Sequence, residues 1–173
     1  MLQSSPKSFP VYKRRQLPQQ ARAHLSVEKP SQTPPGLVLD TNAVLDWLVF
    51  DNAAMRAPAS AITGGRVIWL ACSAMRDELA RMVVHPSLAR WSPDPEAALA
   101  TFDLHAQLRA PPTPGLPERL LCSDSDDQIF VDLALACGAR WLLTHDRALR
   151  KLARRAAARG LAIMLPSDWP VTK

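Results

Sequence analysis

The sequence lacks the features that mark secreted, membrane-spanning or zinc-binding proteins. Its three cysteines are an odd number without a CxxC pair, and its four histidines lack the HxH and HxxxH spacings of zinc ligands. No apolar run approaches the ~18 residues that cross a bilayer, and the first residues contain no apolar core of a secretory signal. We therefore expect a cytoplasmic protein whose cysteines are reduced and serve in packing.

Several catalytic motifs are missing as well. The chain has no GxSxG elbow, and neither Ser73 nor Ser123 has a partnered histidine, so acyl-enzyme chemistry has little support. It has no P-loop and no GxGxxG. What remains is an ordinary composition, with 47% hydrophobic and 21% charged residues in a chain of 173, which fits one domain with a real core.

Positive charge is concentrated in the first 35 residues. These carry six Lys or Arg against a single Glu, whereas basic and acidic residues balance over 36–173. The segment also holds six prolines and no sustained apolar period, which predicts a disordered basic tail over 1–35 and a folded domain over 36–173. An RNA-contacting arm, an inert extension and a misassigned start codon all explain such a tail.

Apolar and amphipathic segments alternate after Gly36. This pattern predicts a three-layer α/β/α fold with a mostly parallel central sheet. The expected strands cover 37–39, 67–71, 119–122, 141–144 and 161–165. The expected helices cover 42–50, 53–63, 73–84, 95–109, 126–137 and 147–159, with Ser73 as an N-cap and Gly138 as a stop. Polar residues that follow the strands are the first candidates for a site, because ligands bind at that edge.

Two aspartates follow predicted strands and begin predicted helices. Asp40 comes directly after an apolar strand, and Asp146 follows the strand that ends at Thr144. N-capping alone explains either aspartate, and it is compatible with metal binding at the same place. Thr144 is expected to help fix Asp146 or a metal-bound water.

Further carboxylates lie in the opening turns of two other helices. Glu78 borders an apolar face, which is unusual for a carboxylate unless it is paired or metal-bound, whereas Asp77 points further toward solvent. Asp127 lies one turn before Phe130, with room to face the sheet edge. In the same run, Asp124 and Asp126 are secondary candidates that a solvated turn also explains. The remaining aspartates, Asp46, Asp51, Asp94, Asp103, Asp132 and Asp168, are expected to be solvated.

Convergence of such carboxylates in one pocket requires a neutralising charge, because they repel each other. A hard divalent cation such as Mg²⁺ or Mn²⁺ supplies it. Next to Asp146, His145 is a candidate for a phosphate contact or an indirect supporting role. The following helix carries basic residues at helical spacing, which form either a solvated face or a phosphate-binding track. The candidate RNA contacts are Arg147, Arg150, Lys151 and Arg154.

Taken in order, these motifs resemble the PIN domain family, and within it the bacterial VapC-like toxins of toxin–antitoxin systems. The resemblance covers about residues 36–170. It is carried by the motifs LVLDTN (37–42), DEL (77–79), DSDDQIF (124–130), LALA (133–136) and WLLTHD (141–146). One departure is His145, where the family commonly has Gly before the last Asp and where the imidazole is expected to crowd the pocket.

The resemblance implies a Mg²⁺- or Mn²⁺-dependent ribonuclease that binds its metal through Asp40, Glu78, Asp127 and Asp146. It implies polar support from Asn42 and Thr144, a homodimer, and inhibition by a small antitoxin protein. Two other readings stay open. One is a catalytically silent PIN-like module that only binds RNA or a protein. The other is a Mg²⁺-dependent phosphatase, although Asp40-Thr41-Asn42 lacks the second Asp that such a nucleophile usually has nearby.

Overall fold

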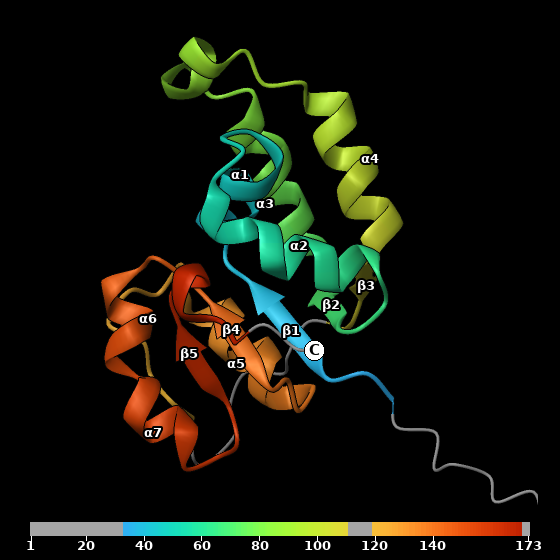
Figure 1. The fold of residues 1–173 in the computed structure, drawn as a ribbon. Coiled ribbons are helices and arrows are strands. Elements are labelled where there is room, and N and C mark those ends of the chain that lie inside the picture. The colour runs from blue at the N-terminus through green and yellow to red at the C-terminus, as the bar shows by residue number, and fades with distance from the viewer. Residues whose placement is uncertain (1–32, 111–118, 171–173) are drawn as a thin grey trace, which may run out of the picture. The chain divides into compact units, whose positions relative to one another are not determined.

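A computed structural model describes residues 33–110 and 119–170 (Figure 1). In these residues a parallel sheet has the strand order β3-β2-β1-β4-β5. The strands are β1 (Gly36–Leu39), β2 (Ile68–Ala71), β3 (Ala106–Leu108), β4 (Trp141–Leu143) and β5 (Ala162–Met164). The α-helices are α1 (Thr41–Leu48), α2 (Arg56–Thr63), α3 (Ser73–Val83), α4 (Pro95–His105), α5 (Gln128–Ala136), α6 (Arg147–Lys151) and α7 (Ala153–Ala157). Short 3-10 helices are η1 (Ala53–Met55), η2 (Pro86–Trp91) and η3 (Pro166–Asp168).

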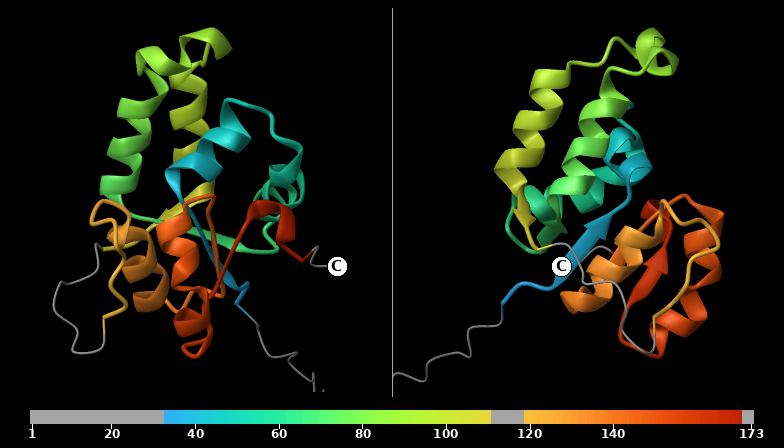
Figure 2. Two further views of the ribbon diagram at one scale, coloured as in Figure 1. Left: turned by 90° about the vertical axis from the view of Figure 1, so that its left-hand side faces the viewer. Right: turned by 180° about the vertical axis from the view of Figure 1, so that it is seen from behind.

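Two groups of helices cover the two faces of this sheet. Helices α1 to α4 lie on one side, and α5 to α7 lie on the other (Figures 1 and 2). Right-handed crossovers produce this division, because the chain moves from β1 toward β3 and later, in the opposite direction, from β4 to β5. The predicted three-layer α/β/α fold is therefore confirmed.

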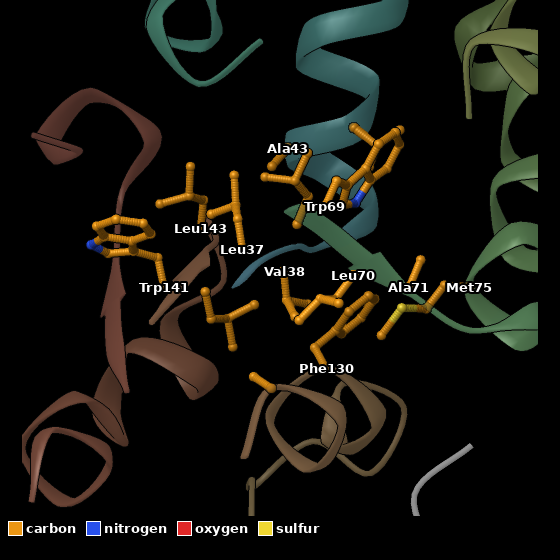
Figure 3. Packing of buried hydrophobic residues seen from close by; sticks show 14 of the residues in the cluster. Leu37, Val38, Ala43, Trp69, Leu70, Ala71, Met75, Phe130, Trp141 and Leu143 are labelled. Atoms are coloured by element: carbon orange, nitrogen blue, oxygen red, sulfur yellow. The ribbon is translucent and has the colours of Figure 1, made fainter. Parts of the chain in front are cut away.

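The core lies on both faces of the central strands (Figure 3). Side chains alternate along β1, so Leu37 faces the layer of α1 together with Trp69, while Val38 faces α5 and its Phe130. Each of these four side chains is at most 2% exposed. Burial on both faces explains why the strands read as short continuous apolar runs instead of alternating ones.

The strand order reverses at β1, and this position is the topological switch point of the sheet. β1 lies between β2 and β4, and its register with β4 pairs Leu39 with Leu143. The residues that follow, Asp40 and Thr144, are consequently neighbours at the carboxyl ends of the two strands. Open α/β sheets bind ligands at such a switch point.

Two predicted elements have other structures. The helix predicted over 95–109 ends at His105, and the next residues form β3, which pairs with β2 through Trp69 and Ala106. The backbone groups at the free edge of β2 are hydrogen-bond partners for β3. They would stay unpaired if α4 continued past His105. The strand predicted over 119–122 is irregular instead, because the Gln128 amide binds Leu120 O (2.8 Å) and Cys122 N (2.8 Å) in place of a strand partner.

Two predicted helix details are also corrected. Cys72 occupies the N-cap position of α3, and Ser73 is the first helical residue, so the predicted serine cap is wrong. The single helix predicted over 147–159 breaks at Leu152, whose N–H bonds to Leu149 O (2.9 Å) in a tighter turn. Leu152 is buried, so this turn directs an apolar side chain to the core.

Gly138 ends α5 as predicted and takes a left-handed conformation with φ of 62°. A Cβ at this position would meet no atom within 4 Å, so only backbone strain opposes a side chain. Gly138→Ala should therefore lower the free energy of unfolding by about 1 kcal/mol. Urea unfolding measures this. Gly64→Ala is a contrasting steric case, because φ is negative there but an added Cβ would lie 2.9 Å from Ser60 O. An unchanged stability of Gly138→Ala would contradict the strain argument.

The tail predicted over 1–35 lies outside the described residues, apart from 33–35. The last of these, Pro35, accepts a hydrogen bond from Ile68 N–H (3.0 Å) at the start of the sheet. Within the described part of the chain, no helix has both the length and the apolar character needed to cross a membrane.

Candidate functional site

Asp40 is fixed at the carboxyl end of β1. Its Oδ1 accepts a hydrogen bond from Ala43 N–H (2.6 Å), and its Oδ2 accepts one from the Thr144 hydroxyl (2.5 Å). Only 2% of the residue is exposed. Burial raises the pKa of Asp40 above its ordinary value, while the bonds from Thr144 and Ala43 and the nearby His145 oppose that rise. Asp40 therefore caps α1 and presents a rigid carboxylate with lone pairs to spare.

Thr144 connects the two strand-end aspartates. Its hydroxyl donates to Asp40 and accepts a hydrogen bond from Asp146 N–H (2.8 Å). Asp146 caps α6 by accepting a bond from Leu149 N–H (2.8 Å) at Oδ1, which leaves Oδ2 without a partner among the described residues. A fully buried threonine thus sets the spacing between Asp40 and Asp146. The predicted support for Asp146 is present at its backbone, and the hydroxyl also supports Asp40.

Asp127 lies at the N-cap position of α5 without forming a capping hydrogen bond. The carboxylate of Asp127 therefore does not bind a backbone N–H of α5 and is available to a ligand. Burial and the nearby carboxylates raise the pKa of Asp127 to about 6. Those carboxylates, in decreasing order of effect, belong to Asp146, Asp124, Asp40 and Glu78. Because such repulsion weakens with distance, the four predicted metal ligands and Asp124 all lie in one neighbourhood.

The pKa of the Cys122 thiol is affected by the same carboxylates. Burial raises its pKa, and the carboxylates of Asp127, Asp146 and Asp124 raise it further, against a hydrogen bond with the Asp124 backbone. Cys122 is therefore a poorly reactive, protonated thiol at neutral pH. The described cysteines Cys72, Cys122 and Cys137 are free, as predicted.

The other sequence candidates lie at the margin. Glu78 is half-buried on α3, and the preceding Asp77 is exposed, as the helix period predicted. Asp126 is exposed, and its N–H donates to Asp124 Oδ1 (3.0 Å) in a local turn. Asn42 is exposed in the first turn of α1, and its side chain forms no hydrogen bond with the described residues.

The donor set suits a hard divalent cation by its chemistry. Carboxylate and hydroxyl oxygens are the ligands of Mg²⁺ and Mn²⁺, and a bound cation would oppose the rise in the pKa of Asp127 that burial and the neighbouring carboxylates cause. In the parts of the chain that the structure describes, no three His, Cys, Asp or Glu side chains form a ready-made ligand cluster. The residue types fit a cation, and its binding would require the carboxylates to move closer together.

An open hollow of about 450 Å³ adjoins Glu78. It is lined by Ala74, Glu78, Arg81, Asp126 and Ile129, from α3, α5 and the segment before α5. A volume of this order accommodates a small ligand or a nucleotide unit. The acidic neighbourhood is therefore accessible from solvent on the side of Glu78.

Asp46 and Asp132 were predicted to be solvated, and both are partnered instead. Asp46 Oδ2 lies 2.7 Å from His145 Nε2 and accepts a bond from Asn52 Nδ2 (2.9 Å), with 13% of its side chain exposed. Asp132 binds the guanidinium of Arg119 and the Gln128 amide. The imidazole of His145 is thus held toward α1. No local pattern in the sequence indicates this role of Asp46, because its partner His145 lies 99 residues later.

The predicted RNA contacts differ in exposure. Arg147, Lys151 and Arg154 are exposed, whereas Arg150 is half-buried and its Nε has no hydrogen-bond partner among the described residues. The break at Leu152 also interrupts the continuous helical face assumed from the sequence. Arg147 and Lys151 of α6 remain one turn apart, directly after Asp146, while Arg81 of α3 lines the hollow beside Glu78 and Asp126.

Ionised Asp127 should destabilise the fold when no divalent cation is bound. Its pKa of about 6 in the folded protein exceeds the ordinary 3.8, so the folded state binds the proton more tightly. The cost is absent below about pH 4 and complete above about pH 6. After allowance for solvent screening, Asp127→Asn should raise the free energy of unfolding by about 1 kcal/mol at pH 8 and leave it unchanged at pH 3.5. Urea unfolding in EDTA measures both, and a loss of stability at pH 8 would contradict the repulsion.

Comparison with known proteins supports the same region. Residues 36–148 match the family model described as PIN domain. This segment starts at β1 and ends within α6, so it includes Asp40, Glu78, Asp127 and Asp146. No curated protein matches the chain significantly.

Proposed function

The chain belongs to the PIN domain family, whose members are generally nucleases, and on this basis we propose that it is a metal-dependent endoribonuclease that hydrolyses RNA phosphodiester bonds. The observation that carries the proposal is the placement of Asp40 and Asp146 at the carboxyl ends of β1 and β4, where the Thr144 hydroxyl binds the Asp40 carboxylate and the Asp146 backbone at the switch point of the sheet. Asp127, whose pKa is raised by burial and then by these and other nearby carboxylates, is a further ligand that a divalent cation would engage there.

Each carboxylate has a separate part in the proposed site. Asp40, Glu78, Asp127 and Asp146 would hold Mg²⁺ or Mn²⁺, with Asp124 and Asp126 nearby. Asp40 is the most rigid of them, since Ala43 and Thr144 fix its two oxygens. Asp127 and Glu78 form no side-chain hydrogen bond with the described residues, so both are suited to adjust to the cation.

The cation, when bound, would activate a water and neutralise the charge that develops on the phosphate. The protein's own residues orient the substrate for this reaction. Arg147, Lys151 and Arg154 would bind backbone phosphates, and the hollow beside Glu78 would receive a neighbouring nucleotide. The thiol of Cys122 stays protonated and forms no covalent intermediate.

A cleavage assay tests the proposal. The purified full chain should cut a labelled RNA in Mn²⁺ or Mg²⁺ and should be inactive in EDTA, and excess Mn²⁺ should restore cleavage. RNA binding without cleavage in any divalent cation would favour the alternative, a silent PIN-like binding module. A phosphatase would instead form an acid-stable phosphate adduct at Asp40, which mass spectrometry detects.

We further propose that the nuclease is the toxin of a toxin–antitoxin pair, a homodimer held inactive by a small antitoxin. The resemblance of its motifs to VapC-like toxins supports this. Induced expression in a bacterial host should arrest growth, and co-expression of the neighbouring reading frame should relieve the arrest. Normal growth of cells that contain the active nuclease would contradict the toxin role without affecting the nuclease assignment.

A further inference from the structure

His145 is held in one orientation by a carboxylate that has no capping or metal-binding part. Its Nε2 lies 2.7 Å from Asp46 Oδ2. Asp46 is in turn fixed by Asn52, through Nδ2 to Oδ2 (2.9 Å) and through its backbone N–H to Asp46 O (2.8 Å). Asn52 itself accepts a bond from Ala54 N–H (3.0 Å) at its side-chain oxygen. The imidazole is thus supported by a chain of hydrogen bonds from α1 and η1.

This support leaves the second ring nitrogen of His145 free. An imidazole bound to a carboxylate through Nε2 presents Nδ1 on the other side of the ring, and Nδ1 has no hydrogen-bond partner among the described residues. The side chain is 40% exposed, so solvent or a ligand can reach it. In the chain it lies between Thr144, which binds Asp40, and Asp146. The charge of His145 also acts on the Asp40 carboxylate, whose pKa it lowers, so a polar ring atom is available near one of the proposed metal ligands.

We propose that His145, oriented by Asp46, contacts the ribose 2′-hydroxyl of the nucleotide at the cleavage site and thereby makes the site prefer RNA to DNA. This inference rests on the proposed nuclease function. A 2′-hydroxyl is the group that distinguishes RNA from DNA, and it both donates and accepts hydrogen bonds.

A hydroxyl suits Nδ1 better than a phosphate oxygen does. With Nε2–H directed at Asp46, neutral imidazole offers an acceptor at Nδ1, and imidazolium offers a donor there. The 2′-hydroxyl pairs with either form, whereas a phosphate oxygen pairs only with imidazolium. The contact consequently does not depend on the protonation state of the ring. The adjacent Arg147 and Lys151 already supply the charge that phosphates require.

Single 2′-deoxy substitutions in an RNA substrate test the contact. For the unmodified protein, kcat/KM should fall about tenfold when the deoxy nucleotide adjoins the scissile bond, as expected for one lost hydrogen bond, and should be unchanged when it lies elsewhere. His145→Gln keeps an N–H near the Nε2 position and so retains the bond to Asp46, but it has no group at Nδ1. It should lose about tenfold on all-RNA and show no further loss on the deoxy substrate.

Two more variants separate this role from a structural one. His145→Asn places an amide near the Nδ1 position, so it should retain part of the sensitivity to the deoxy nucleotide. His85→Gln is the matched control, because within the described residues the imidazole of His85 hydrogen-bonds to Ser87 at the start of η2; this variant should behave like the unmodified protein. Full activity of His145→Gln, or losses from variant and deoxy nucleotide that multiply to about a hundredfold, would overturn the inference.

Failure of the proposed function gives a different result. If the unmodified protein cleaves no RNA in any divalent cation, the nuclease assignment fails. The same set of variants and oligonucleotides is then compared by fluorescence-anisotropy binding in EDTA. An affinity equal for the RNA and every deoxy oligonucleotide would overturn the 2′-hydroxyl contact as well, whereas a position-specific loss that disappears in His145→Gln would uphold it.

Discussion

Asp40→Asn is expected to lower the rate of RNA cleavage by roughly a thousandfold or more while leaving the fold intact. The loss follows because the amide cannot provide the negative charge that holds a divalent cation, and a catalytic cation contributes several kcal/mol to transition-state stabilisation. The fold should persist because asparagine is an equally good N-cap and its oxygen can accept the bond from Ala43. A single-turnover cleavage assay and a thermal melt measure the two effects.

Asp94→Asn is the matched control for this substitution. Asp94 caps α4 in the same manner, through Ala97 N–H (2.9 Å), but it belongs to none of the groups around Asp127. Both variants change an N-cap carboxylate to an amide. Asp40 is also buried and accepts the Thr144 hydroxyl, so the thermal melt measures the cost of losing that contact separately from the loss of metal binding. Undiminished metal-dependent cleavage by Asp40→Asn would remove Asp40 from the site, and equal losses in both variants would indicate a general effect on the fold.

Removal of two basic side chains from α6 should give the second-largest effect. We expect the double variant Arg147→Ala/Lys151→Ala to bind single-stranded RNA roughly a hundredfold more weakly at low salt. Its affinity should also depend less steeply on salt concentration. Each lost phosphate contact should reduce the slope of log K against log salt by about 0.7, so two should reduce it by about 1.4. Fluorescence anisotropy across a salt series, in EDTA to prevent cleavage, measures both quantities.

Arg66→Ala/Arg140→Ala is a control with the same change of net charge. These residues precede β2 and β4, at the amino ends of the strands and so at the sheet edge opposite Asp40. The control variant should keep the salt slope of the unmodified protein. If the two double variants weaken binding equally, overall charge governs affinity, and α6 has no special part in RNA binding.

The sequence was sufficient for the features that depend on apolar runs and strand ends. The alternation of strand and helix patterns predicted a mostly parallel sheet covered on both faces, and Asp40 and Asp146 followed directly from strand ends. The N-cap interpretation did not compete with the site, because both aspartates cap a helix while facing the switch point. Gly138 was predictable for a similar local reason, since a left-handed helix end favours glycine.

Features that depend on distant partners were not predictable. The strand β3 forms because β2 has a free edge, which no local pattern in 106–108 reveals. The irregular segment after Arg119 depends on the Gln128 side chain, and the position of His145 depends on Asp46, 99 residues earlier. Asp46 was assigned to solvent because no strand precedes it. Its role depends on the fold, which brings His145, just before α6, next to Asp46 of α1.

Titration of Mn²⁺ into the protein by calorimetry tests the central claim, that the carboxylates of Asp40, Glu78, Asp127 and Asp146 form one divalent-cation site. We expect saturable binding to the unmodified protein and to Asp94→Asn, and loss of that binding in Asp40→Asn. Binding near pH 6 should also release protons, because Asp127 is partly protonated there. Equal Mn²⁺ binding by Asp40→Asn and the unmodified protein would contradict the claim.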